Sequence, residues 1–117
     1  GRRTAAMMEA INHPALGVNW DPGNAFMAGD VPYPDGYEAI RPWLTHVHFK
    51  DAEVTADGQR RYALQGQIDW PGQIQALVTD GYQGYISVET HLRPKVKAVR
   101  EELALLRQYI EQAGQAR

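Results

Sequence analysis

The chain has 117 residues, a length typical of one domain, with 44% hydrophobic and 22% charged residues and a formal net charge of −2. Nucleic-acid binding usually requires clustered Lys and Arg, so this balance argues against a polyanion partner, and the apolar runs are too short to cross a membrane. The absence of cysteine excludes disulfides, thiolate nucleophiles and Cys-type zinc sites. We therefore expect a cytoplasmic protein in which His, Asp, Glu or Asn would hold any metal.

The first half of the chain is predicted to place two strands around a long Gly- and Pro-rich loop. The expected elements are a helix, a strand, the loop, a brief helix and a second strand, at Thr4–Ile11, Leu16–Trp20, Ala25–Gly36, Gly36–Leu44 and Leu44–Phe49. The first strand is followed at once by "DPGN", a strong turn signal. It therefore delivers Asp21 to its C-terminal tip.

The second half is predicted to contain two well-defined helices around a third strand. Its expected elements are a loop or weak hairpin, a helix, a strand and a final helix, at Ala52–Gln67, Asp69–Gly81, Gly84–Thr90 and Lys95–Gly114. Asp69 is an N-cap candidate with Pro71 in the first turn. The final helix repeats apolar residues at helical spacing, namely Val96, Val99, Leu103, Leu106 and Ile110.

Three strands that alternate with helices predict an α/β fold with a parallel sheet and right-handed crossovers. In such folds ligands bind at the carboxyl ends of the strands. Those ends carry Asp21, His48 and Glu89. Read singly, Asp21 is also typical of a turn former, and His48 of a core histidine. Together they favour a divalent ion such as Mn²⁺, Mg²⁺, Co²⁺ or Zn²⁺.

The segment "HVHFKD" ends the second strand with four polar side chains. Because side chains alternate along a strand, His46 and His48 share one face, and the apolar residues between them pack outward against helices. His46 lies deeper and is expected to be a packing or supporting residue. Lys50 follows on the same parity, and either binds a phosphate or substrate hydroxyl or is solvated. Asp51 either orients His48 or caps a turn.

The motifs "GVNWDPGN", "HVHFKD" and "GQIDWPGQIQALVTDGYQGYISVETH" together resemble the C-terminal part of the xylose isomerase-like TIM-barrel superfamily, the sugar phosphate isomerases and epimerases. The resemblance implies that residues 1–117 form the last three βα units of a partial TIM (β/α)8 barrel whose N-terminal part is absent. The chain opens on "GRRTAAMMEAINHP", without an initiator Met and with a helix already under way. We therefore expect a piece of a longer protein.

The resemblance also implies a divalent metal held by Asp21, His48 and Glu89. The family's additional Glu, on the preceding strand, has no counterpart, since only a helix precedes Leu16. Reaction would begin with removal of a proton next to a carbonyl and pass through a metal-stabilised enediolate. Glu89 would be one catalytic acid/base group.

The same resemblance implies a small sugar or sugar phosphate as substrate, with Asn24 holding one of its hydroxyl groups and His91 either contacting it or serving as an auxiliary metal ligand. Strand parity adds Lys50 to the candidate substrate-binding residues. One alternative is a catalytically inactive partial barrel that self-associates as a homo-oligomer through open strand edges. Another is an inosose-type dehydratase. An abasic-site endonuclease fits less well, because it needs further His and Asp ligands and a His where Asn24 stands. No nucleic-acid or membrane partner is expected.

Overall fold

The centre of the molecule is a three-stranded parallel sheet in the order β1-β2-β5, described by a computed structural model of residues 1–115. The strands are β1 (Val18–Trp20), β2 (Leu44–Phe49) and β5 (Ile86–Val88). In β2, His46 lies opposite Asn19 of β1, and His48 lies opposite Ser87 of β5. The predicted parallel α/β arrangement is therefore confirmed. Within residues 1–115 the sheet remains open and does not close into a barrel.

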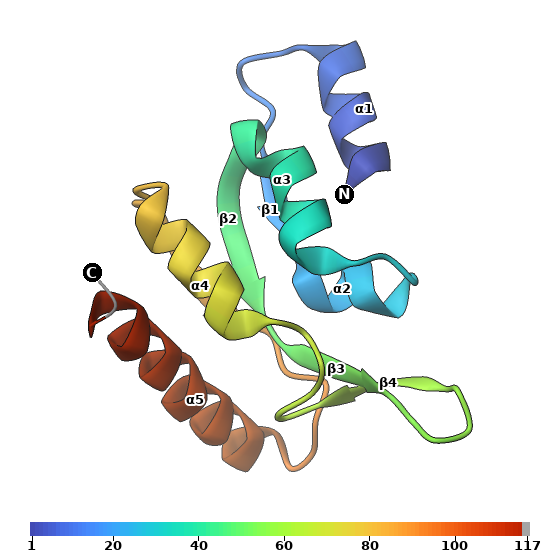
Figure 1. The fold of residues 1–117 in the computed structure, drawn as a ribbon, viewed down its shortest axis with the longest axis vertical. Coiled ribbons are helices and arrows are strands. Elements are labelled where there is room, and N and C mark those ends of the chain that lie inside the picture. The colour runs from blue at the N-terminus through green and yellow to red at the C-terminus, as the bar shows by residue number, and fades with distance from the viewer. Residues whose placement is uncertain (116–117) are drawn as a thin grey trace.

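Helices flank the sheet on either side of β2 (Figure 1). They are α1 (Arg2–Ile11), α2 (Pro22–Met27), α3 (Tyr37–Ile40), α4 (Trp70–Thr79) and α5 (Lys95–Gln115), with a π-helical turn at Pro32–Gly36 and a 3-10 turn at Arg41–Trp43. In Figure 1, α4 and α5 run side by side, while α1 to α3 lie across β2 from them. Among residues 1–115, every helix falls short of the length and hydrophobicity that a membrane-spanning helix requires.

The expectation of a loop throughout Ala25–Gly36 is wrong, because α2 extends to Met27 and a π-helical turn begins at Pro32. The reason is local. Asp21 caps α2 through a bond from the Asn24 N–H, and Pro22 occupies the first helical turn. A proline there loses no helical hydrogen bond and presets φ. The sequence "DPGN" therefore starts a helix instead of only turning the chain.

The apolar core lies between the sheet and the helices. Val47 and Phe49 are fully buried, and the Phe49 ring packs against Trp70 at 4.6 Å between ring centroids. The opposite face of the same strand carries His46 and His48, which are only partly buried. Alternation along β2 thus separates an apolar face under the helices from a polar face that bears the site.

Helix α5 buries a different face from the one predicted. Its buried residues are Ala98, Glu102, Leu106, Tyr109 and Ala113. Of the five apolar residues expected to pack inward, Val96, Leu103 and Ile110 are exposed, at 68%, 37% and 44%. Small alanines on the buried face allow α5 to pack closely, which hydrophobicity alone does not reveal.

An antiparallel hairpin follows β2 and projects away from the sheet in Figure 1. It comprises β3 (Asp51–Val54) and β4 (Arg60–Ala63), so the hairpin alternative for this stretch is the correct one. Two bonds attach it to α2. Arg60 Nη1 donates to the Phe26 carbonyl at 2.9 Å, and Tyr62 Oη donates to Asn24 Oδ1 at 3.1 Å. The hairpin therefore forms one wall of the rim at the strand ends.

We expect Trp20→Phe to destabilise the fold by about 1–3 kcal/mol, the cost of leaving a buried polar atom unpaired. Trp20 Nε1 donates to Gln73 Oε1 at 2.8 Å, and both side chains are buried. Urea unfolding of the two proteins measures the difference. Trp43→Phe is the control, because the half-buried Trp43 forms no such bond among the described residues. Equal losses in the two variants would contradict the assignment.

Candidate metal centre

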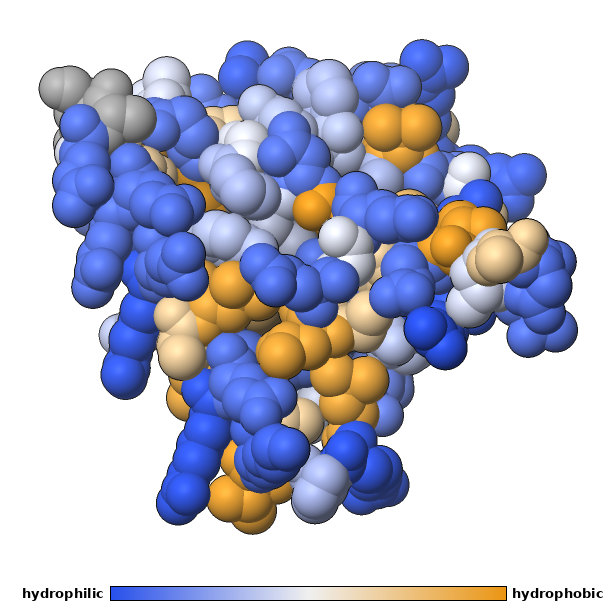
Figure 2. Space-filling model, turned by 60° about the horizontal axis from the view of Figure 1, so that its bottom comes forward, coloured by the Kyte–Doolittle hydropathy of each residue, from blue (hydrophilic) through white to orange (hydrophobic). Residues whose placement is uncertain are grey.

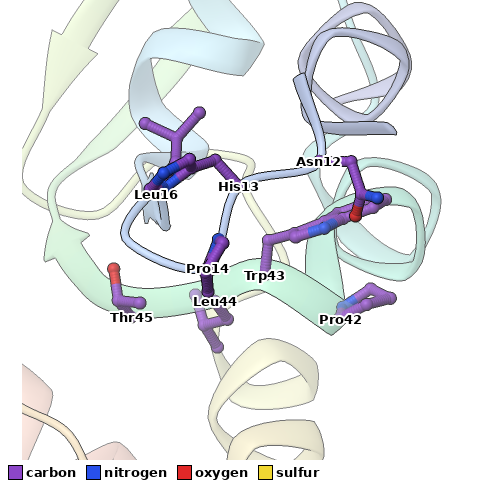
Figure 3. A pocket seen from close by; sticks show the side chains of 8 residues that line it. All are labelled: Asn12, His13, Pro14, Leu16, Pro42, Trp43, Leu44 and Thr45. Carbon is purple, nitrogen blue, oxygen red and sulfur yellow. The ribbon is translucent and has the colours of Figure 1, made fainter. Parts of the chain in front are cut away.

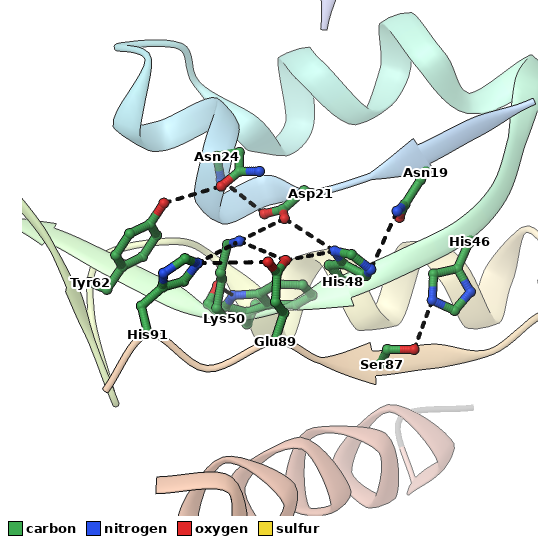
Figure 4. Close-up of polar contacts among 11 residues, drawn as sticks. Asn19, Asp21, Asn24, His46, His48, Lys50, Tyr62, Ser87, Glu89 and His91 are labelled. Carbon is green, nitrogen blue, oxygen red and sulfur yellow. Dashed lines mark hydrogen bonds and ion pairs between the residues drawn. The ribbon is translucent and has the colours of Figure 1, made fainter. Parts of the chain in front are cut away.

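Three predicted ligands come together at the carboxyl ends of the strands (Figure 4). Asp21 follows β1, His48 lies near the end of β2, and Glu89 follows β5. One ligand atom from each residue lies within 4.8 Å of the other two. The Glu89 N–H donates to the Phe49 carbonyl at 3.2 Å, which extends the pairing of β2 with β5 to the site. That these side chains hold a metal remains a prediction.

Asp21 serves the fold and faces the site at once. Its Oδ1 caps α2 by accepting from the Asn24 N–H at 2.9 Å. Its Oδ2 points the other way, 2.9 Å from Lys50 Nζ and 3.4 Å from His48 Nδ1. The two sequence interpretations of Asp21, turn former and candidate ligand, are therefore compatible because they use different oxygens.

His48 presents Nδ1 to the two carboxylates. This nitrogen lies 2.8 Å from Glu89 Oε2 and 3.4 Å from Asp21 Oδ2. On the far side of the ring, Nε2 lies 3.3 Å from Asn19 Nδ2. A contact on the remote nitrogen fixes the orientation of an imidazole ligand. Asn19 was missed by the sequence reasoning, although strand alternation places it on the same face as Asp21.

Lys50 is the most deeply buried charged side chain of the centre, with 2% of its side chain exposed. Its Nζ lies 2.9 Å from both Asp21 Oδ2 and Glu89 Oε2, and 3.3 Å from His91 Nε2. Burial acts to lower the pKa of Lys50, but the two carboxylates outweigh it, so the pKa is raised. In turn, the hydrogen bond from Lys50 lowers the pKa of Glu89. The expectation that Lys50 points toward the site agrees with this geometry.

The predicted substrate residues Asn24 and His91 lie on the rim, joined by Tyr62 of the hairpin. Tyr62 stacks on the His91 ring at 4.2 Å between centroids, and its hydroxyl donates to Asn24. Lys50 Nζ lies 5.4 Å from the centroid of the Tyr62 ring. Sequence reasoning missed Tyr62, because it lies in a polar stretch where no periodicity marks an inward side chain.

A buried carboxylate supports the segment that carries Glu89 and His91. Glu102 of α5 is 2% exposed, and its Oε1 accepts from Thr90 Oγ1 at 3.0 Å. Thr90 Oγ1 in turn accepts from the Leu92 N–H at 3.1 Å. Burial raises the pKa of Glu102, while the bond from Thr90 acts in the opposite direction. Glu102 therefore anchors the β5–α5 connection from behind the site.

The other two polar residues of "HVHFKD" support the structure around the centre. His46 Nε2 lies 2.8 Å from Ser87 Oγ, which agrees with its expected supporting role. Asp51 accepts from three backbone N–H groups, those of Ala52, Gly66 and Ile68, at 2.8 to 3.1 Å. Of its two sequence interpretations, the turn-capping one is the correct one.

The donor set fits a borderline divalent ion, because it combines two carboxylates with one imidazole. Asp21 Oδ2 supports the fit. This oxygen is buried. Lys50 Nζ and His48 Nδ1 lie near it, but it accepts no well-directed hydrogen bond from the described residues. An oxygen of this kind retains lone pairs for a cation. The residues present could therefore hold a divalent ion.

Two further surface features lie outside this cluster. A pocket of 390 Å³ is bordered by Leu44 and Thr45 at the opposite end of β2, and His13 beside it accepts from the Ala15 N–H (Figure 3). Hydrophobic side chains also gather on part of the face seen in Figure 2. Tyr85, next to β5, is 83% exposed. Self-association through the open strand edges of the sheet remains a prediction, tested by size-exclusion chromatography.

Comparison with known proteins places these observations in a family context. The sequence model described as xylose isomerase-like TIM barrel matches residues 2–109. Inosose dehydratase of Bacillus licheniformis is 30% identical over 108 residues, covering 79% of this chain and 36% of that protein. The chain thus spans about a third of the length of this curated relative.

Two solved structures have a similar fold. A xylose isomerase domain protein from Planctomyces limnophilus matches with a TM-score of 0.80 and 21% identity, over 98% of this chain and 44% of that one. The probable 3-DHS dehydratase AsbF from Bacillus anthracis matches with a TM-score of 0.70 and 22% identity, over 89% and 43%. At these identities the likeness concerns the fold alone.

Proposed function

The chain belongs to the xylose isomerase-like TIM barrel family, and from this premise we propose that it contributes the metal-binding rim of an enzyme that enolises a sugar or sugar phosphate. The observation that carries the proposal is the convergence of Asp21, His48 and Glu89, with one ligand atom of each within 4.8 Å of the others. TIM-barrel enzymes place their chemistry at this end of the strands.

Each side chain has a defined task in this proposal. Asp21, His48 and Glu89 would hold the ion, which when bound supplies Lewis-acid polarisation of a substrate carbonyl. Glu89 would also exchange a proton with the carbon next to that carbonyl, because its side chain is 45% exposed and can be reached by a substrate. Asn19 keeps the His48 ring turned toward the two carboxylates.

Substrate binding is assigned to the rim. Asn24, Lys50 and His91 present an amide, an ammonium and an imidazole on one side of the centre, and Tyr62 adds an aromatic face. A sugar presents several hydroxyl groups, and a few well-placed donors and acceptors of this kind fix such a ligand in a site. Together these groups support a small polyhydroxylated ligand.

Two fates of the deprotonated substrate are open to this rim. Return of the proton to the other face or to the neighbouring carbon gives an epimerase or isomerase, which we propose as the main function. Departure of a neighbouring hydroxyl gives a dehydratase, and this second candidate is favoured by the names of two similar proteins, an inosose dehydratase and a probable 3-DHS dehydratase. Both begin with the same proton removal.

Deuterium exchange separates these outcomes. The full-length protein, supplied with Mn²⁺ in D₂O, is incubated with a ketose, a ketose phosphate or an inosose and followed by proton NMR. Exchange at the carbon next to the carbonyl supports enolisation. An isomeric or epimeric sugar then identifies the main function, and a dicarbonyl product that has lost one water identifies the dehydratase. If none of the three substrates exchanges deuterium, both candidate functions are contradicted.

A further inference from the structure

We propose that the Lys50 ammonium and the divalent ion compete for the same two carboxylate oxygens, so that metal loading releases Lys50 toward the substrate. The inference rests on the proposed function, because it requires that the centre binds a metal. It couples the contact between Lys50 and the substrate to metal binding, which ion binding alone does not imply. A side chain that contacts substrate would become available only when the ion is in place.

The competition follows from which atoms are shared. Lys50 Nζ lies 2.9 Å from Asp21 Oδ2 and 2.9 Å from Glu89 Oε2. The same two oxygens are the ones nearest His48 Nδ1, at 3.4 and 2.8 Å. A cation bound between His48 Nδ1 and the carboxylate oxygens nearest to it would therefore meet the oxygens that Lys50 already contacts. Two cations in contact with the same oxygens repel each other, so one must withdraw.

Packing encloses the stem of Lys50, so any movement of its ammonium would have to come from the last bonds of the side chain. Gly23 lies against the stem, and a Cβ added at that position would come within 2.5 Å of Lys50 Cγ. The side chain is 2% exposed, so its methylene groups are enclosed by protein. Withdrawal must then occur by rotation near the ammonium, because the rest of the side chain has no space to shift.

The ammonium has a second set of neighbours on the substrate side. His91 Nε2 lies 3.3 Å from Nζ, and the centroid of the Tyr62 ring lies 5.4 Å from it. An aromatic face stabilises a nearby cation. In Figure 4 these two rings lie on the side of Lys50 that also carries Asn24. An ammonium displaced by the ion would join the residues proposed to contact substrate.

The test compares Mn²⁺ binding to the full-length protein and to its Lys50→Met variant by calorimetric titration. Methionine keeps an unbranched stem of similar length and removes the charge. We expect Lys50→Met to bind Mn²⁺ at least about tenfold more tightly, since a like charge in contact shifts ionic equilibria by one to three powers of ten. The control is Lys97→Met, whose lysine is 71% exposed and pairs with Glu101. Its affinity should match the wild type.

Thermal unfolding gives a second readout. In EDTA, Lys50→Met should melt below the wild type, because Asp21 and Glu89 lose their shared cation. Saturating Mn²⁺ should reduce the difference in melting temperature between Lys50→Met and the wild type. Lys50→Gln, which retains N–H donors without the charge, provides the folded comparison if the methionine variant unfolds, and the same increase in affinity is expected.

Two different failures can be told apart. In the first, the wild type binds Mn²⁺, and folded Lys50→Met and Lys50→Gln bind it with equal or weaker affinity. That result would overturn the competition and leave the metal centre intact. If the wild type and both variants all fail to bind Mn²⁺, Co²⁺ and Zn²⁺, the metal centre of the proposed function fails, and the competition fails with it.

Discussion

Glu89→Gln is expected to lower the affinity of the centre for Mn²⁺ by more than about 100-fold. Loss of a residue that only supports a ligand costs up to about 100-fold, and Glu89 is proposed as a ligand itself. Glu89 Oε2 lies 2.8 Å from His48 Nδ1 and 2.9 Å from Lys50 Nζ, so it stands between the imidazole and the ammonium. The amide removes one of the two negative charges that face the ion. Calorimetric titration of the full-length protein measures the loss directly.

A control of equal exposure is available on α5. Glu101 is 44% exposed, nearly the same as the 45% of Glu89, and within residues 1–115 its ion pair is with Lys97 on the same helix. Glu101→Gln should bind Mn²⁺ as the wild type does. In the full-length protein, Glu89→Gln should also abolish exchange next to the substrate carbonyl. Unchanged metal affinity, or retained exchange, would contradict the roles proposed for Glu89.

Asp51→Ala is expected to destabilise the chain by about 3–5 kcal/mol, because it leaves three N–H groups near the core without their acceptor. Asp51 is 3% exposed and accepts from Ala52, Gly66 and Ile68. These bonds hold the end of the hairpin connection against the start of β3. Urea unfolding gives the overall loss, and hydrogen exchange at the Gly66 and Ile68 amides shows where it arises.

The Asp51 result has two comparisons. Asp57→Ala removes an exposed aspartate at the hairpin tip that accepts one bond, from Thr55 Oγ1, and should cost no more than about 1.5 kcal/mol. Asp51→Asn keeps the shape but can retain only one acceptor oxygen, and Oδ1 alone serves Ala52 and Ile68 while Oδ2 serves Gly66. The stability of Asp51→Asn should therefore lie between those of the wild type and Asp51→Ala. An alanine variant as stable as Asp57→Ala would show that water replaces the lost acceptor.

The parallel sheet was predictable because its signals are local. Each strand is short, apolar on one face and followed by a turn or polar tip, and alternation then assigns His46 and His48 to one side. The face of α5 was not predictable in this way. Helical spacing offers more than one apolar face, and the face that packs is decided by the neighbours it meets, here including the buried Glu102.

The residues of the candidate site also differ in how far the sequence could predict them. Asp21, His48 and Glu89 could be proposed from the sequence because strand tips of a parallel sheet meet at one edge. Strand parity also indicated the direction of Lys50, but not its burial between two carboxylates. Tyr62 reaches the site only because the hairpin folds back onto α2. That contact depends on pairing between distant residues, which a single sequence does not encode visibly.

The hairpin tip offers a place to attach a reporter. It closes on itself, since the Thr55 N–H donates to the Gln59 carbonyl at 2.7 Å and the Gly58 N–H donates to the Thr55 carbonyl at 2.9 Å. Ala56 lies between these bonds and is exposed. Because the sequence contains no cysteine, Ala56→Cys would introduce a unique thiol for a fluorophore. Its emission would follow the hairpin while the core and the strand tips stay unmodified.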